Sequence, residues 1–413
     1  MNRKSLNLLL FIFLVAYLQL AKAELTTQSQ GLLEATNINE SGPMKELGLH
    51  LGGWVDAGVT YNANDPGDKN NGPTSYADRD SELQMNQLYL YMERTVNRQG
   101  SAWDLGGRAD FMFGTDAYKT QSFDNFDRNL ISSNDLRFYD IAFPQAYLEL
   151  FAPIGNGLSI KAGHFYTIIG KEGVTAPGNF FYSRNYSFTW AGPFTHTGVL
   201  LNYPADNHFS IDAGAVMGWD NVDREAGVWN FIGGVKWKNT DNSTSASLHV
   251  ITGDYDESVS ANRTRYTLLI NHDFTDRLHY TFQHDYAFQD QWFSFNGVNP
   301  PQFPKTASWY GINNYLTYDI DDHLKAGLRA EWFRDHDGVR VTRSARGETI
   351  NGGNLLNGGS GYYAITAGLN WKPLGWLNIR PEVRYDWADK AKAFDAGNKD
   401  NQFTFSTDII VNF

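Results

Sequence analysis

The sequence contains no cysteine, which excludes disulfide bonds, thiol catalysis, cysteine-ligated metal sites and a lipid anchor on cysteine. It also lacks an excess of positive charge: the formal net charge at pH 7 is −12, which disfavours a nucleic-acid partner. Beyond the amino-terminal region no stretch of 18 consecutive apolar residues occurs, so membrane-spanning helices are excluded there. If the mature chain lies in a membrane, it must cross it as a β-barrel.

The composition combines many aromatic residues with low average hydropathy. Aromatic side chains make up 15% of the 413 residues, whereas hydrophobic residues reach 42% and the mean hydropathy is −0.44. Transmembrane barrel strands have this composition, because each strand carries one lipid-facing apolar side and one polar side toward the lumen. A barrel can also take a chain of this length as a single domain.

The amino-terminal region has the three parts of a secretory signal peptide. A basic end is followed by an apolar run over residues 8–18 and a small-x-small cleavage motif at 21–23. The run is too short to serve comfortably as a membrane anchor. We therefore predict a signal peptide over 1–23, a loosely ordered polar periplasmic segment over 24–46, and a barrel over 47–413.

From residue 47 onward, segment after segment alternates with a period of two. For example, Leu324, Leu328 and Trp332 share an apolar face, and Arg329 and Glu331 share the opposite one. Aromatic residues bracket these apolar faces eight to ten residues apart. At about 3.3 Å per residue and a tilt near 40°, that spacing spans roughly 20–25 Å. The length matches the apolar band of an outer-membrane barrel.

Short and long connections alternate along the chain. Seven short ones consist of turn residues, as at Asn239-Thr240-Asp241-Asn242, and eight long ones separate them. This predicts an all-β fold, a transmembrane antiparallel barrel of sixteen strands with short periplasmic turns and long extracellular loops. Irregular segments at 82–96 and 141–151 leave fourteen or eighteen strands open. The long loops are expected at 62–81, 116–139, 168–190, 220–228, 254–262, 290–307, 335–361 and 388–401.

Strand parity assigns charged side chains of both signs to the lumen. We predict that the third long loop folds inward and narrows the pore, with an outward loop as the alternative. Glu172 on this loop would then face four arginines of the wall, and the resulting transverse field would orient polar solutes. The alternative is that the charges only pair along a wet wall, and their near balance leaves the ion preference open. The four arginines are Arg108, Arg329, Arg380 and Arg384, and the full set of predicted pore-lining residues is Arg108, Asp110, Lys161, Glu172, Asp212, Lys236, Arg265, Arg329, Glu331, Arg380, Glu382 and Arg384.

The middle of the chain carries a distinctive block of motifs. Gly163-His164-Phe165 is followed by a glycine-containing step, then by Asn179-Phe180-Phe181-Tyr182-Ser183-Arg184, and then by Pro193-Phe194-Thr195-His196-Thr197-Gly198. This block, within residues 155–200, resembles the OmpL-like β-barrel porin family, and the strand layout is compatible with that family from 47 to 413. The resemblance implies an outer-membrane porin and no particular solute.

Three functions are compatible with these patterns. We expect a porin of the bacterial outer membrane that passes small hydrophilic solutes by passive diffusion. A closed barrel that acts as an adhesin or structural protein through its long loops is the alternative. An outer-membrane hydrolase using Ser183 and His196 is the third hypothesis. No His-Glu-x-x-His, Gly-x-Ser-x-Gly or phosphate-binding glycine loop occurs, so we expect no enzyme activity, no cofactor and no metal.

The expected partners follow from the location. They are outer-membrane lipid and lipopolysaccharide. Divalent cations could bridge the lipopolysaccharide phosphates to the acidic loops. The alternative is that these loops are simply a solvated surface. The last strand ends in Phe413 on its apolar face, which is typical of substrates of the barrel assembly machinery. A homotrimer and a monomer both remain open.

Overall fold

The computed structural model describes residues 31–122, 126–127, 130, 138–222, 227–255, 261–290, 306–341 and 359–413. The predicted signal peptide lies outside these residues. Strands form most of the described chain, in segments where apolar and polar side chains alternate. The strands are β1 (His50–Asn62), β2 (Gln84–Arg94), β3 (Asp104–Gly114), β4 (Asp140–Ala142), β5 (Ala146–Ala152), β6 (Leu158–Tyr166), β7 (Thr195–Pro204), β8 (Phe209–Val216), β9 (Asn230–Lys238), β10 (Thr244–Asp254), β11 (Asn262–Asp273), β12 (Leu278–Gln289), β13 (Ala307–Asp319), β14 (Leu324–Asp335), β15 (Ser360–Leu374), β16 (Leu377–Ala388) and β17 (Asn401–Asn412).

Helical segments are few and short among the described residues. Two of them, α2 and α3, are α-helical, and the others are 3-10 or π-helical turns. They are η1 (Leu32–Thr36), η2 (Ile38–Glu40), α2 (Gly42–Leu47), α3 (Ala117–Thr120), η3 (Ala176–Gly178), the π-helical η4 (Ser187–Ala191) and η6 (Asp395–Gly397). None of these helices has both the length and the apolar character needed to span a bilayer.

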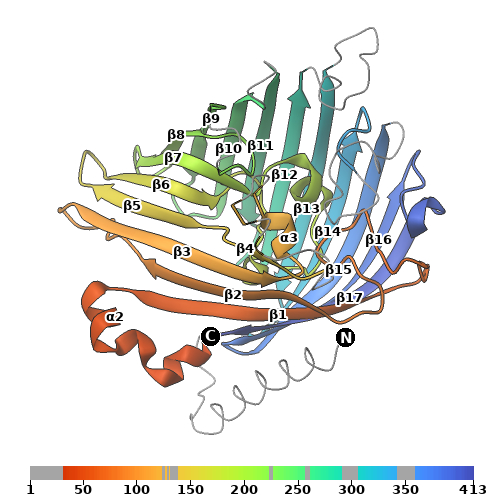
Figure 1. Ribbon diagram of the computed structural model, residues 1–413, viewed down its shortest axis with the longest axis horizontal. Coiled ribbons are helices and arrows are strands. Elements are labelled where there is room, and N and C mark those ends of the chain that lie inside the picture. The colour runs from red at the N-terminus through yellow and green to blue at the C-terminus, as the bar shows by residue number, and fades with distance from the viewer. Residues whose placement is uncertain are drawn as a thin grey trace.

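The strands form one closed antiparallel barrel. Each strand pairs with its neighbour in sequence, and β1 pairs with both β2 and β17, so the sheet has no free edge. Figure 1 shows this closure, with the last, blue strands beside the first, red one. The short β4 and the following β5 both pair with β3 and are two halves of one wall strand. The described strands therefore make a sixteen-stranded barrel, as predicted.

The interruption between β4 and β5 has a local cause. Pro144 lies in the three-residue gap and has no N–H to donate to the ladder. The neighbouring Gln145 carbonyl still accepts from the Asp110 N–H at 2.9 Å, and the Phe143 N–H donates to Asp127 at 3.2 Å. This irregular segment is one of the two that left the strand count open from sequence.

The alternation of turns and loops follows the prediction. Seven short turns join β2–β3, β5–β6, β7–β8, β9–β10, β11–β12, β13–β14 and β15–β16, and the eight long connections lie between them, some with residues beyond those described. The β9–β10 turn is closed by Asn239, whose Oδ1 accepts from the Thr244 N–H at 3.0 Å. Because the number of strands is even, the chain enters β1 and leaves β17 on the same side of the barrel, the side of the short turns.

The two faces of the wall have opposite polarity. Leu248 and Phe405 point outward and keep 51% and 49% of their surface exposed, whereas inward Asp386 and Gln402 are fully buried. An exposed apolar belt of this kind suits a lipid environment, since lipid takes the place of water there. Inside the barrel, the polar side chains form hydrogen bonds with each other and with the loops.

The last residue completes the wall against β1. The Phe413 N–H donates to the Gly53 carbonyl at 2.9 Å, and the Gly53 N–H donates to the Phe413 carbonyl at 3.0 Å. A Cβ on Gly53 would lie 2.6 Å from the Phe413 ring, so the ring covers the bare backbone of this outward-facing glycine. The predicted lipid-side position of Phe413 agrees with this contact.

The segment before β1 is more ordered than expected. We predicted a loose polar stretch, but its described part forms η1, η2 and α2. Asn39 fixes this part to the wall: its Oδ1 accepts from the Leu51 N–H at 2.8 Å, and its Nδ2 donates to the Leu51 carbonyl at 3.0 Å. Through these two hydrogen bonds the Asn39 amide attaches the segment to the start of β1.

Candidate functional site

The β6–β7 loop, residues 167–194, crosses the interior of the barrel. It corresponds to the third long loop, predicted at 168–190, and of the two placements considered the structure shows the inward one. Gly327 and Gly58 face it from the wall, where a Cβ would lie 2.3 Å from the Phe180 ring and 2.6 Å from the Tyr182 ring, respectively. These glycines make room for aromatic side chains of the loop. Inward glycines within strands are the sequence signal for this contact, which the sequence analysis missed.

Glu172 of the β6–β7 loop is the centre of a buried ionic network. Its carboxylate accepts hydrogen bonds from Arg329 Nη1 at 2.8 Å, Tyr315 Oη at 3.0 Å and the Asn185 N–H at 2.7 Å. Arg329 also pairs with Glu331 at 2.8 Å and donates to the Ser183 carbonyl at 2.8 Å. Because each charge has a partner and the remaining donors are used, the network compensates for the cost of burial.

Strand β16, which is separated from β14 by β15, holds the same loop through three charged side chains. Arg380 pairs with Asp408 and donates from Nη1 to the Ala176 carbonyl at 2.9 Å. Glu382 accepts from two loop N–H groups, those of residues 182 and 183, at 3.0 and 3.2 Å. Arg384 pairs with Glu331 at 2.8 Å and donates to a loop carbonyl, that of residue 184, at 3.1 Å. These side chains fasten the loop to the wall.

This arrangement changes the expected electrostatics. Glu172 does meet Arg329, but the two groups are in direct contact and nearly buried, with no water-filled gap between them. Arg380 and Arg384 bind loop carbonyls, as described. Arg108 does not face Glu172: it pairs with Glu93 at 2.8 Å and Asp110 at 2.7 Å on a different part of the wall. Glu172 and Arg329 therefore form a direct ion pair, in place of the expected field across a water-filled gap between the loop and the wall arginines.

The loop is also fixed to β2, which sequence reasoning did not anticipate. Gln87 donates from Nε2 to the Val174 carbonyl at 2.8 Å and accepts from the Ala176 N–H at 3.0 Å. Asn86 accepts from Tyr182 Oη at 2.9 Å. Inward amides gave no signal in the sequence, because an inward Gln or Asn is equally typical of a wet wall.

Two acidic groups outside the strands lie at the ends of this assembly. Burial raises the pKa of Asp116 to about 7, although hydrogen bonds from Asn86 and Gln87 act against the rise. Burial likewise raises the pKa of Asp220 to about 6, and its carboxylate accepts from the N–H groups of Phe194 and Thr195 at 2.7 and 2.9 Å. Asp220 thereby ties the end of the loop to the β8–β9 connection.

The other predicted charges line the wall from β3 to β10, and no hydrogen bond found for them goes to the loop. Asp212 accepts from Lys236 at 2.7 Å, from His249 at 3.0 Å and from an asparagine amide at 2.7 Å. The Lys161 ammonium lies 4.2 Å from the centre of the Tyr147 ring. The Lys236 and Arg108 side chains keep 44% and 18% of their surface exposed inside the barrel.

Arg265 belongs to neither group alone. It pairs with Asp285 at 2.7 Å on the neighbouring strand. Its guanidinium also lies against the loop, where a Cβ on Gly192 would come within 1.8 Å of Nη1. The other eleven predicted residues divide into those that hold the loop and those that lie on the wall from β3 to β9.

Ser183 and His196 do not form a nucleophile and base pair in the described structure. The Ser183 hydroxyl accepts from Arg329 Nη2 at 3.0 Å. His196 makes its contacts with the Gly218 carbonyl and the Thr167 hydroxyl, both at 3.0 Å. No group of three or more His, Asp or Glu residues in the described ranges is arranged to hold a metal ion.

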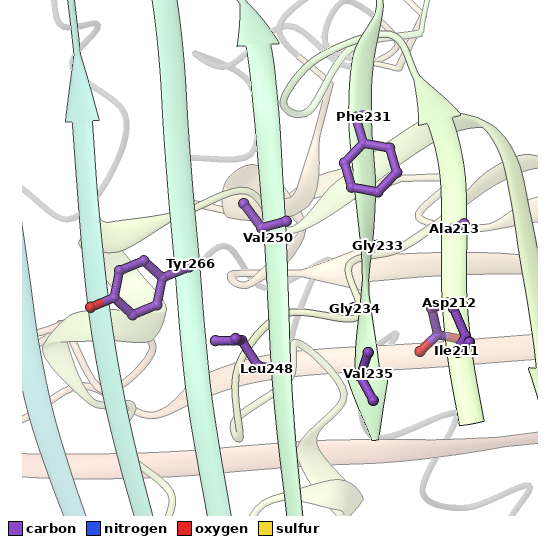
Figure 2. Close-up of a pocket in the computed structure, with 10 residues that line it drawn as sticks. All are labelled: Ile211, Asp212, Ala213, Phe231, Gly233, Gly234, Val235, Leu248, Val250 and Tyr266. Carbon is purple, nitrogen blue, oxygen red and sulfur yellow. The ribbon is translucent and has the colours of Figure 1, made fainter. Parts of the chain in front are cut away.

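A depression of about 570 Å³ lies on the outside of the barrel and not in the lumen. Figure 2 shows it over β8–β11, where Gly233 leaves a flat floor between larger apolar side chains. Because its exposed atoms are almost entirely apolar, the depression belongs to the lipid-facing belt. Its lining includes Ile211, Ala213, Phe231, Val235, Leu248, Val250 and Tyr266.

Comparisons with known proteins agree with this architecture. The channel DcaP of Acinetobacter baumannii shares 14% identity with a TM-score of 0.54, covering 88% of this chain and 97% of that one. OprB of Pseudomonas putida shares 11% identity with a TM-score of 0.59, covering 94% and 99%. OmpT of Vibrio cholerae, in its trimer form, shares 12% identity with a TM-score of 0.52, covering 88% and 99%.

At the level of sequence, no curated protein matches the chain significantly. The family model described as "Putative beta-barrel porin-2, OmpL-like" matches residues 48–413, which include the whole barrel from β1 to β17. This match places the protein in the bacterial outer membrane as a porin-like barrel. The chain belongs to the OmpL-like β-barrel porin family.

Proposed function

We propose that the protein is a porin that passes small hydrophilic solutes by passive diffusion. The observation that carries this proposal is the partial exposure of Lys236 on β9 and Arg108 on β3 inside the barrel, where neither side chain bonds to the β6–β7 loop. A charged side chain that is exposed inside a closed barrel borders water-filled space. Solutes would pass on this side of the loop, among the paired charges of β3–β10.

The direct test is planar-bilayer recording of the refolded protein. We expect stepwise ion conductance, and partitioning of neutral sugars of increasing size would give the limiting radius. A matched variant, Lys236→Gln, should change the reversal potential in a salt gradient without changing the conductance by more than a small factor. A preparation that folds by heat-shift electrophoresis but shows no conductance contradicts the proposal.

A closed barrel that acts through its loops is the second candidate, and one observation favours it. At the long-loop end, buried apolar side chains form a continuous cluster that includes Trp190 of the loop, Ile232 of β9 and Trp309 of β13. Such a cluster connects opposite walls and would restrict passage. Absence of conductance, together with binding of cells or matrix by the intact protein, would support this second function.

We infer that copies of the chain associate through the wall formed by β5–β9, giving the homotrimer that the sequence left open. These strands have seven to ten residues, and a strand of eight residues at about 3.3 Å each and a tilt near 40° spans about 20 Å, the lower end of the roughly 20–25 Å that matches the apolar band. The bilayer would have to thin at this wall, and contact with another copy removes that cost. A mass of one chain in detergent by light scattering would contradict the trimer.

The remaining partners are also proposals. Outer-membrane lipid would cover the apolar belt, and lipopolysaccharide would meet the long loops. The carboxy-terminal strand would be recognised by the barrel assembly machinery, in line with the position of Phe413 at the closure of the wall. Deletion of Phe413 should reduce the assembled fraction in cells more than it reduces refolding in detergent.

A further inference from the structure

Two arginines at the long-loop end are buried among aromatic rings. Arg263 is the second residue of β11, and its guanidinium carbon lies 3.4 Å from the centre of the Tyr255 ring and 4.8 Å from that of Trp219. Arg340 follows β14, and its guanidinium carbon lies 4.9 Å from the centre of Trp309 and 5.8 Å from that of Trp219. The two cations therefore share one indole ring. We call these five residues the outer arginine cluster.

The two arginines of the outer arginine cluster have no carboxylate partner among the described residues. Arg329, Arg380 and Arg384 each form ion pairs. Within the described chain, neither Arg263 nor Arg340 does. Arg263 donates from Nε to Gln289 Oε1 at 2.6 Å, and Arg340 donates from Nε to a backbone carbonyl, that of residue 190, at 2.7 Å. Both acceptors are neutral, so both positive charges are left without a directly contacting anion.

Three donors in this cluster and on the adjoining Gln289 have no acceptor among the described residues. Nη2 of Arg263, Nε1 of Trp219 and Nε2 of Gln289 are all buried without a hydrogen-bond partner. Burying an unpaired donor is costly, and burying it on a guanidinium is costlier still, so native structures rarely tolerate several together. Because all three are donors, what would satisfy them is a group with clustered acceptor oxygens and negative charge.

Two described carboxylates near the outer arginine cluster are engaged elsewhere. Asp220 follows Trp219 in the chain, but its carboxylate accepts from the Phe194 and Thr195 N–H groups at 2.7 and 2.9 Å. Asp335 accepts from three backbone N–H groups, those of residues 339–341, each at 2.9 Å. These two carboxylates hold loops in place, and neither forms an ion pair with Arg263 or Arg340 within the described residues.

We propose that Arg263 and Arg340 form an anion-binding site at the outer mouth of the barrel, which takes small solutes bearing a carboxylate or a phosphate. Guanidinium groups suit both, because their planar N–H forks match the spacing of the oxygens in these anions. The aromatic rings hold the forks in place and exclude water, which strengthens the interaction. The role of the site as an entry point rests on the proposed channel function, whereas binding itself does not.

The test is isothermal titration of the full protein in detergent with inorganic phosphate and, separately, with acetate. We expect saturable binding of at least one of them, weakened tenfold or more in Arg263→Gln and in Arg340→Gln. Arg277→Gln, an exposed arginine in the β11–β12 turn, is the matched control and should bind as the wild type does. Arg263→Lys retains charge without the fork and should give intermediate binding.

Heat-shift electrophoresis establishes that each variant is folded before titration. If the wild type shows no saturable binding of either anion, or if folded Arg263→Gln and Arg340→Gln bind as well as the wild type, the site does not exist. Conductance in bilayers is measured on the same preparations. Conductance without anion binding overturns the site and keeps the channel, and binding without conductance keeps the site and overturns the channel.

Discussion

Replacing Glu172 with glutamine should release the β6–β7 loop from the wall without unfolding the barrel. The side chain keeps its shape but loses the charge that faces Arg329 at 2.8 Å, and its new amide donors oppose the Asn185 N–H. Removing one partner of a buried ion pair costs about 3–5 kcal/mol, and the lower end applies because Glu331 still pairs with Arg329. About 3 kcal/mol corresponds to a more than hundredfold rise in the open population of the loop.

Hydrogen exchange measures this change directly. The Asn185 amide, which donates to Glu172 at 2.7 Å, should exchange about a hundredfold faster in Glu172→Gln. Bilayer recordings should show larger current noise. Glu40→Gln is the control, because Glu40 pairs with Lys45 on the exposed surface and such pairs contribute little. If exchange at Asn185 and current noise both equal those of the wild type, the ion pair does not hold the loop.

Three further predictions concern the wall and its loops. Leu248→Arg places a charge on the lipid face and should lower the free energy of unfolding in vesicles by about 2–4 kcal/mol, whereas the inward Ser247→Arg should cost much less. Phe413→Ala uncovers Gly53 and should lower the urea midpoint of the refolded barrel, and an unchanged midpoint would remove the ring from the closure. Because the pKa of Asp116 is raised from 3.8 to about 7, the folded state binds more protons than the unfolded chain in that window. The free energy of unfolding should therefore fall as pH rises from 3.8 to about 7 and then level off, and Asp116→Asn should lose this slope.

Much of the barrel could be predicted because its signals are local. The alternation at Leu324–Trp332 assigns each side chain to a face within a few residues, and the turn at Asn239–Asn242 identifies its own geometry. Because these two local patterns recur along the chain, they predict the strand count and place both termini of the barrel chain on the short-turn side. Even the irregular segment at 141–151 was recognisable, since Pro144 breaks the ladder wherever the strand lies.

The loop and its anchors could be predicted only in part. The motif block indicated an aromatic loop, and parity placed Arg329, Arg380 and Arg384 inside. Parity does not say which inward groups meet, so the pairing of Arg108 with Glu93 and Asp110 was missed. The anchoring amide of Gln87 was missed for the same reason.

The sequence by itself determined the class and the two faces of the wall, favoured sixteen strands with fourteen or eighteen open, and indicated the family. The tertiary structure decided which charges are paired. Glu172 and Arg329 are 157 residues apart, and their contact depends on the path of the loop through the lumen. The same path and the barrel register give the inward arginines of β14 and β16 a carboxylate and leave Arg263 without one. The physical reason is that side-chain parity is a property of each strand, whereas partnership inside a barrel depends on distances between strands and loops remote in sequence.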